Sequence, residues 1–166
     1  PTLDTAIVYP GTVLYEGTML SEGRGTTRPF ELIGAPWLDG DKLAERMNKV
    51  GLKGVHFRSV TFEPTFQKHA RATCGGCQIH VTSREAFLPV KAGVSLLREC
   101  YGSAPDRFAW RDPPYEYEHD KMPIDILAGS PALREEIEEQ TPLEEIVASW
   151  RPGVAEFAEI RRNYLL

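Results

Sequence analysis

The chain has 166 residues, of which 42% are hydrophobic and 26% are charged, and its formal net charge is -5 at pH 7. This length and composition fit one globular domain with a sizeable core, or one module of a larger protein. The acidic balance, without a block of Lys and Arg, argues against nucleic acid as a partner. No apolar run approaches the roughly 18 residues that span a bilayer, so we expect no membrane span.

The first half of the chain predicts short strands and helices. Residues 2–15 are apolar but contain a Pro-Gly pair, which predicts one short helix or strand before the pair and a second element after it. Residues 39–50 predict a helix that Asp39 or Asp41 caps and that Gly51 ends. Hydrophobic patterning predicts strands over residues 30–35, 55–62 and 77–81.

The second half predicts helices around one long loop. Residues 82–85 match a capping box and predict a helix that Pro89 kinks or restarts and that ends near Tyr101. Residues 107–120 are rich in aromatic residues, prolines and charges, and they predict a long ordered loop. Two further helices are predicted over residues 123–127 and 130–140. A second capping box at residues 141–144 predicts the start of a last helix, which a later Pro-Gly pair should kink.

Together these elements predict an α/β or α+β fold. We expect residues 1–166 to form a single domain with a small mixed sheet of three or four strands covered by helices. The last element should be a long, kinked C-terminal helix.

Three cysteines are too few, and odd in number, for a disulfide framework. Cys74 and Cys77 form a CxxC pair between His69 and His80, which invites a zinc or thioredoxin-like interpretation. A strand follows the pair, however, whereas a redox motif would precede a helix and a zinc knuckle would need a second, well-separated pair. We therefore interpret the cysteines as reduced structural thiols and expect no metal and no cofactor.

The most unusual local pattern surrounds Arg24, which has a glycine on each side. Flanking glycines let the backbone adopt positive φ, so that a turn can present the guanidinium to a carboxylate or phosphate. This pattern predicts an anion-binding loop within residues 16–37. The alternative is a tight surface turn whose arginine is only solvated.

A second polar segment covers residues 113–120, where tyrosines alternate with carboxylates. Tyr115 and Tyr117 could stack on a sugar, Glu116 could accept hydrogen bonds from hydroxyls, and His119 could titrate near neutral pH. The alternative is a solvated loop whose tyrosines lie on the core. Glycoside hydrolysis uses two carboxylates roughly 5–10 Å apart. The candidate carboxylates are Glu16, Glu22, Glu116, Glu118, Asp120 and Asp125. For Asp125 we expect a capping role at the start of a helix.

Several short motifs occur in an order that resembles the C-terminal domain of the exo-β-N-acetylmuramidases, bacterial glycosidases of peptidoglycan turnover. They are EGT at 16–18, SEGRGT at 21–26, PF at 29–30, GAPW at 34–37, QIHVT at 78–82 and PPYEYEHD at 113–120. The resemblance covers nearly the whole chain. One departure is Met19, which stands where we expect an asparagine.

The resemblance implies a two-domain parent protein whose N-terminal domain is Rossmann-like and whose active site lies in the cleft between the domains. The implied reaction removes terminal N-acetylmuramic acid from peptidoglycan fragments, which is compatible with a periplasmic or secreted parent. The glutamate proposed as catalytic in this family belongs to a Pro-Glu-His-Gly motif of the N-terminal domain, and this chain contains no such motif. We therefore expect no catalytic residue here and no turnover by the chain alone.

The resemblance also gives Arg24 a candidate ligand, because N-acetylmuramic acid carries a lactyl carboxylate. Our hypothesis is that Arg24 binds this carboxylate while other residues line the same cleft. The predicted substrate-binding residues are Glu16, Arg24, Tyr115, Glu116, Tyr117 and His119. The alternative function is a non-catalytic module that binds cell-wall sugars or another domain.

Overall fold

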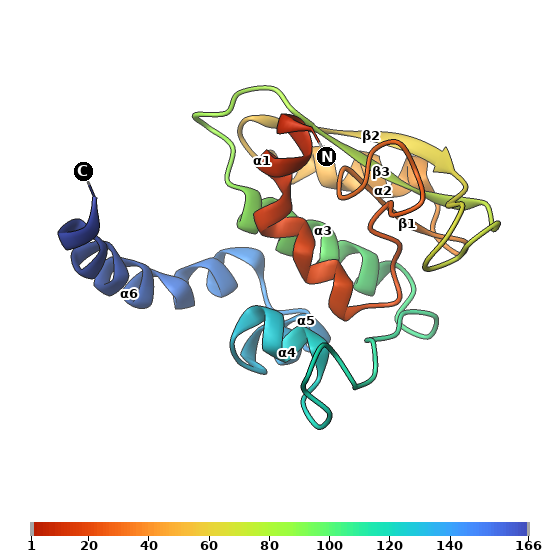
Figure 1. The fold of residues 1–166 in the computed structure, drawn as a ribbon. Coiled ribbons are helices and arrows are strands. Elements are labelled where there is room, and N and C mark those ends of the chain that lie inside the picture. The colour runs from red at the N-terminus through yellow and green to blue at the C-terminus, as the bar shows by residue number, and fades with distance from the viewer. Residues whose placement is uncertain (1, 166) are drawn as a thin grey trace.

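The structure is a computed structural model that describes residues 2–165 (Figure 1). Its elements, with η for 3-10 helices, are α1 (Leu3–Thr12), η1 (Val13–Gly17), β1 (Leu32–Ala35), α2 (Gly40–Lys49), β2 (Val55–Phe62), β3 (Cys74–Val81), α3 (Pro89–Ser103), α4 (Pro123–Ala128), α5 (Ala132–Glu138), α6 (Leu143–Arg161) and η2 (Arg162–Tyr164). The predicted combination of a small sheet of three or four strands, covering helices and a long C-terminal helix is confirmed, with three strands in the sheet.

The sheet has the strand order β1-β3-β2, and both pairings are antiparallel. The predicted mixed sheet is therefore wrong. Strands β1 and β2 are joined through α2 and run in the same direction, but β3 inserts between them and pairs with both. No parallel neighbours arise among the described strands for this reason.

Side-chain alternation gives the sheet one apolar and one polar face. Ile33, Phe57 and Ile79 are buried on the apolar face and belong to the hydrophobic core that the helices complete. The opposite face carries polar residues such as His56 and Arg58. The helices that contact this small sheet most closely are α2 and, to a lesser extent, α1.

The Pro-Gly pair near the N-terminus does not interrupt the first helix, because α1 continues through Pro10 to Thr12. The glycine of this pair instead lies where α1 and α3 cross closely. A Cβ atom on Gly11 would lie 1.9 Å from the carbonyl oxygen of Pro89, and one on Gly93 would lie 2.3 Å from the oxygen of Gly11. These glycines allow α1 and α3 to approach at backbone distance.

Neither predicted capping box forms. Residues 82–85 make a turn instead of a helix, because the N–H groups of Thr82 and Ser83 both point to the carbonyl of Gly54. Helix α3 begins only at Pro89, which occupies its first turn, and continues past Tyr101 to Ser103. At the second box α6 starts where predicted, but no side chain caps it.

The other predicted helices and strands lie within a few residues of their expected positions. Asp39 caps α2 by accepting a hydrogen bond from the Lys42 N–H at 3.1 Å. Strand β3 begins at Cys74 and so includes the whole CxxC pair. Helix α6 continues through Pro152, and a kink there stays a prediction. Figure 1 shows α6 extending away from the sheet and the other helices.

Candidate functional site

Two segments that are 90 or more residues apart in sequence lie side by side after η1. The N–H of Met19 donates to the carbonyl of Ala109 at 2.9 Å, and the N–H of Arg111 donates to the carbonyl of Gly17, also at 2.9 Å. On its other side the first segment pairs with β1 through Ser21 and Gly34. The sheet therefore positions residues 17–21, which lead into the turn around Arg24. These residues in turn position residues 109–111, which lead into the 113–120 segment.

The glycine-flanked turn around Arg24 has the conformation that its sequence predicts. Gly23 and Gly25 have φ values of 74° and 83°, which side chains rarely adopt. The carbonyl of Gly25 accepts hydrogen bonds from the N–H and the hydroxyl of Thr65, each at 2.9 Å. The turn is thus fixed by the loop between β2 and β3.

Arg24 belongs to a linear series of five side chains that we call the polar chain. The hydroxyl of Tyr115 donates to Glu16 Oε2 at 2.9 Å, and Arg24 Nη2 contacts Glu16 Oε1 at 2.6 Å. On its other edge Arg24 Nε lies 3.2 Å from Glu22 Oε1. Lys68 Nζ completes the series at 2.8 Å from Glu22 Oε2. Charges alternate along the polar chain, so each carboxylate is neutralised.

Lys68 serves as a structural clamp at the buried end of the polar chain. Besides Glu22, its ammonium group donates to the carbonyls of Tyr15 at 2.8 Å and Leu20 at 3.2 Å. All three of its protons are therefore used. Burial lowers the pKa of Lys68 even though the adjacent Glu22 carboxylate raises it.

The polar chain forms one side of a pocket of about 300 Å³, which we call the Arg24 pocket. Its lining residues are Glu16, Glu22, Arg24, Gln67, Lys68, Arg111, Tyr115 and Glu116. Four of the six predicted site residues lie here. Tyr117 and His119 do not: Tyr117 is 95% exposed at the tip of a turn that Tyr115 and Glu118 close with two backbone hydrogen bonds. Met19 also lies outside the lining, with its side chain partly exposed.

Electrostatics favours the protonated forms of Tyr115 and Arg24 in the polar chain. Burial and the hydrogen bond to Glu16 raise the pKa of Tyr115 to about 12, so this side chain stays a neutral donor. Burial would lower the pKa of Arg24, but the hydrogen bond and charge of Glu16 and the charge of Glu22 raise it. Both oxygens of Glu16 already accept hydrogen bonds. The arrangement suits ligand binding better than proton transfer.

The family model described as "Exo-beta-N-acetylmuramidase NamZ, C-terminal" matches residues 7–166. The chain belongs to the NamZ C-terminal family. The resemblance inferred from the short motifs is therefore confirmed.

A curated member of the NamZ family is the peptidoglycan β-N-acetylmuramidase NamZ of Bacillus subtilis (strain 168), which is 40% identical over 166 residues. The match covers 100% of this chain and 38% of that relative. Two solved DUF1343 family proteins of Bacteroides fragilis NCTC 9343 share the fold. The first has a TM-score of 0.82 at 24% sequence identity, and the match covers 97% of this chain and 41% of that protein. The second has a TM-score of 0.65 at 22% sequence identity, and the match covers 100% of this chain and 41% of that protein.

Three lining residues of the Arg24 pocket were missed in the sequence: Gln67, Lys68 and Arg111. Lys68 lies in a loop without regular patterning, and nothing local indicates its buried partner. Arg111 could have been found, because it lies two residues before the start of the PPYEYEHD motif on which the NamZ resemblance rests. Its guanidinium carbon lies 5.4 Å from the centroid of the Tyr115 ring.

The remaining candidate carboxylates lie elsewhere. Asp125 does not cap α4, whose N-cap residue is Met122, because its two oxygens accept hydrogen bonds from Arg134 at 2.9 and 3.1 Å. Glu118 accepts from the backbone N–H groups that follow it in its own loop. Asp125, Glu118 and Asp120 line a separate pocket of about 600 Å³.

The CxxC pair has no geometry for metal or redox chemistry. Cys74 and Cys77 are three residues apart on one strand and so point to opposite faces of the sheet. Both are free and buried, and burial raises their pKa values to about 11 and about 12. Within residues 2–165 no three His, Cys, Asp or Glu side chains gather in a way that could hold a metal ion.

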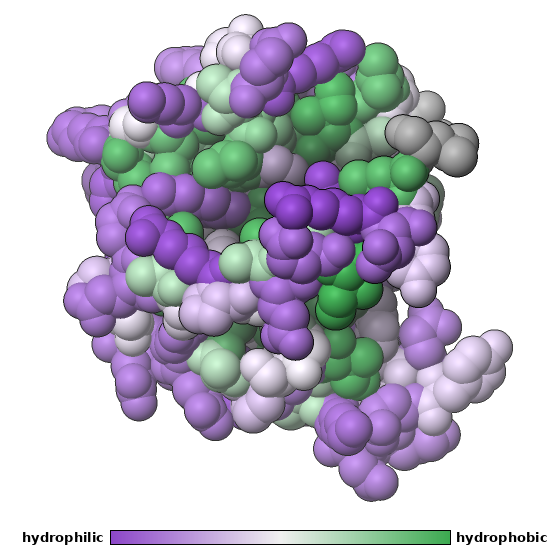
Figure 2. All heavy atoms as spheres, turned by 90° about the vertical axis from the view of Figure 1, so that its left-hand side faces the viewer, coloured by the Kyte–Doolittle hydropathy of each residue, from purple (hydrophilic) through white to green (hydrophobic). Residues whose placement is uncertain are grey.

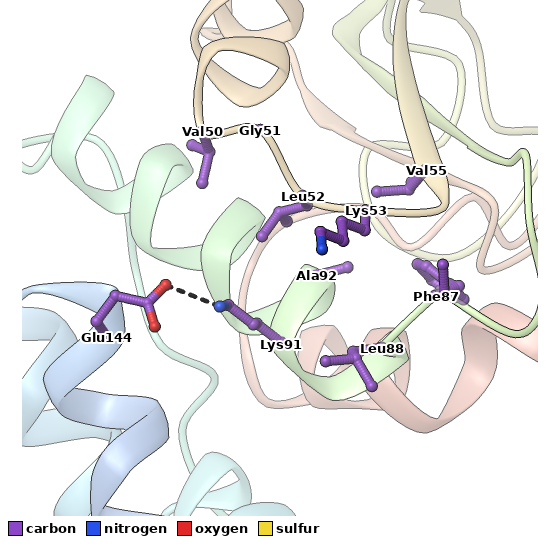
Figure 3. A pocket seen from close by; sticks show the side chains of 11 residues that line it. Val50, Gly51, Leu52, Lys53, Val55, Phe87, Leu88, Lys91, Ala92 and Glu144 are labelled. Carbon is purple, nitrogen blue, oxygen red and sulfur yellow. Dashed lines mark hydrogen bonds and ion pairs between the residues drawn. The ribbon is translucent and has the colours of Figure 1, made fainter.

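A second pocket, of about 240 Å³, lies between the end of α2 and the start of α3 (Figure 3). Val50, Leu52 and other apolar side chains provide much of its lining. Figure 3 shows Lys91 and Glu144 directed toward each other, and their charged atoms are 2.7 Å apart. This pocket has no cluster of free polar groups and contains none of the NamZ motifs, so the Arg24 pocket is the better candidate. In the described part of the chain, no helix combines the length and apolarity that crossing a membrane requires.

Proposed function

We propose that this chain is the substrate-binding domain of an exo-β-N-acetylmuramidase and forms one wall of its active-site cleft. The reaction is the release of terminal N-acetylmuramic acid from peptidoglycan fragments. The observation that carries the proposal is the Tyr115–Glu16 hydrogen bond, because it joins the EGT and PPYEYEHD motifs at one pocket. Membership of the NamZ C-terminal family supplies the reaction class.

The chemistry of the Arg24 pocket supports binding of a sugar. Its lining is polar and charged throughout, as hydroxyl and carboxylate groups require, and it includes the tyrosine ring of Tyr115 as an apolar surface. Glu16 and Glu22 are engaged by Arg24 and Lys68 and are poor general acids. The catalytic acid comes from the other wall of the cleft.

That other wall belongs to an N-terminal Rossmann-like domain of the same parent protein. Two observations support this part of the proposal. The chain covers only 38% of its Bacillus subtilis relative, so a NamZ protein has room for a further domain. The second observation is an apolar surface on the last helix.

The C-terminal half of α6 carries large apolar side chains that nothing in residues 2–165 covers. Val154 and Phe157 are 64% and 62% exposed, and Ile160 is 51% exposed. Val154 also lines an apolar groove of about 490 Å³ between α6 and the start of α3. Figure 2 views the molecule from the side of the free end of α6 and shows hydrophobic patches between hydrophilic residues. Apolar surfaces of this kind are typical of docking sites.

The test uses the full-length parent and the variant Arg24→Lys. Lysine keeps the charge but cannot bridge Glu16 and Glu22 as the guanidinium fork does. We expect kcat/KM for release of N-acetylmuramic acid to fall at least tenfold, with Arg107→Lys at an exposed position outside the pocket lining as the matched control. The isolated 166-residue chain should release none. Unchanged turnover in Arg24→Lys, or turnover by the isolated chain, would contradict the proposal.

The second candidate function is a non-catalytic module that binds cell-wall sugars or another domain. The exposed apolar face of α6 favours it, since docking alone would account for that face. The two functions separate in one assay. A full-length parent that binds muramic acid glycans without cleaving them would be a binding protein.

A further inference from the structure

One cation of the Arg24 pocket is not part of the polar chain. Arg111 lies just after Trp110, which pairs with Thr18 across the two adjacent segments, and its backbone is fixed by the hydrogen bond to Gly17. Its side chain nevertheless lines the pocket. No hydrogen bond or ion pair engages its guanidinium within residues 2–165.

The three cations of the pocket differ in how their charge is balanced. Arg24 lies 2.6 Å from the carboxylate of Glu16 and 3.2 Å from that of Glu22. Lys68 lies 2.8 Å from the other oxygen of Glu22. Arg111 has no carboxylate within ion-pair distance in the described chain, and its charge helps to lower the pKa of Lys68. An incoming anion therefore meets two neutralised cations and one that is not neutralised.

The position of Arg111 also suits a planar anion. Its guanidinium lies over the Tyr115 ring, and a stacked guanidinium keeps its N–H edges available for hydrogen bonds. The ring is itself held by Glu16 through the Tyr115 hydroxyl. A fork of two parallel N–H donors matches a carboxylate in a bidentate geometry.

We infer that Arg111, and not Arg24, binds the lactyl carboxylate of N-acetylmuramic acid, and that Arg24 instead holds the pocket wall together. This inference rests on the proposed function and deepens it. Arg111 is then the residue that distinguishes muramic acid from glucosamine, because only the former carries the carboxylate. Tyr115 and Glu16 are positioning residues for it.

The test measures a preference between two substrates in the full-length parent. One is a chromogenic aryl β-glycoside of N-acetylmuramic acid, and the other is the same glycoside with its lactyl carboxylate converted to the methyl ester. Both have nearly the same shape, but only the first is an anion. We expect the parent to prefer the acid at least tenfold in kcat/KM.

In Arg111→Gln, kcat/KM for the acid should fall further than kcat/KM for the methyl ester, so that this preference falls close to one. Arg111→Lys should restore part of the preference, since it keeps the charge without the fork. Arg107→Gln is the matched control, because Arg107 is exposed and outside the pocket lining. It should keep the full preference.

Three outcomes would overturn the inference. The first is a preference that survives in Arg111→Gln, and the second is an equal loss of both substrates in that variant. In both cases turnover by the unmodified parent still supports the proposed function. The third is a parent that cleaves neither glycoside, which refutes the proposed function and the inference together.

Discussion

The hydroxyl of Tyr115 lies 2.9 Å from the carboxylate of Glu16, although 99 residues separate them in the sequence. The bond joins the two segments that line the Arg24 pocket. Since the other oxygen of Glu16 contacts Arg24, a change at any of these three residues affects its neighbours. The pocket wall should therefore respond to substitution as one unit.

The state of this bond can be measured by titration of Tyr115. Burial and the bond to Glu16 raise its pKa to about 12, from an ordinary value of about 10. A raised tyrosine pKa contributes stability that is complete below pH 10 and is lost as the pH rises from 10 to 12. In Tyr115→Phe we expect one late component to disappear from the ultraviolet tyrosinate titration.

The matched control for that titration is Tyr117→Phe, because this side chain is 95% exposed. It should leave the late components unchanged. Tyr15, whose pKa burial also raises well above its usual value, contributes a late component in every variant. Identical titration curves for the two Phe variants would contradict the predicted bond.

Lys68 should matter for stability more than other charged residues. Its side chain is 12% exposed and that of Glu22 only 3%, so Lys68→Met leaves a buried carboxylate with one cation fewer. Breaking a buried ion pair in this way costs about 3–5 kcal/mol. Urea unfolding should show a loss of that order, against no measurable loss for Lys42→Met in the exposed pair with Asp39. Equal losses would show that Lys68 is not a clamp.

The turn that carries Arg24 depends on Gly25. Its φ of 83° disfavours any side chain, and a Cβ atom there would lie 2.7 Å from the backbone nitrogen and oxygen of Phe66. We expect Gly25→Ala to lower the unfolding free energy by about 2 kcal/mol or more and to weaken ligand binding. Gly153→Ala, where no atom lies within 4 Å, should not lower it. A fully stable Gly25→Ala variant would refute this conformation of the turn.

The three cysteines should be unreactive in the folded protein. Cys74, Cys77 and Cys100 are buried, and burial raises the pKa of each thiol. Since the thiolate is the reactive form, a colorimetric thiol reagent should label none of them at pH 8 and all three in urea. Rapid labelling of Cys74 and Cys77 in the native state, or zinc that copurifies in equimolar amount, would restore the alternative reading of the CxxC pair.

Patterns that depend on a single segment predicted the structure well. Strand β2 follows from its alternation, and α2 follows from Asp39 at its start and an amphipathic face. The capping box at residues 82–85 did not form because the N–H groups of residues 82 and 83 bind Gly54, a partner that local sequence cannot indicate. The sheet came out antiparallel because β3 pairs between β1 and β2, which again depends on distant residues.

The same division holds for the candidate site. The glycines around Arg24 predicted the turn correctly, since positive φ is a local property. Its pairing with Glu16 and Glu22, and the free guanidinium of Arg111 beside it, come from contacts between loops. Sequence therefore identified two of the three segments of the pocket, while the ion pairs that balance the charge of Arg24 are seen only in the structure.

The most direct test of the central claim is a structure of the full-length parent with N-acetylmuramic acid bound. We predict that the sugar lies in the Arg24 pocket and contacts Tyr115, with its lactyl carboxylate about 2.7–3.2 Å from the guanidinium nitrogens of Arg111. A sugar bound in the cleft without contact to any residue of this pocket would contradict the claim that this domain forms a wall of the active site.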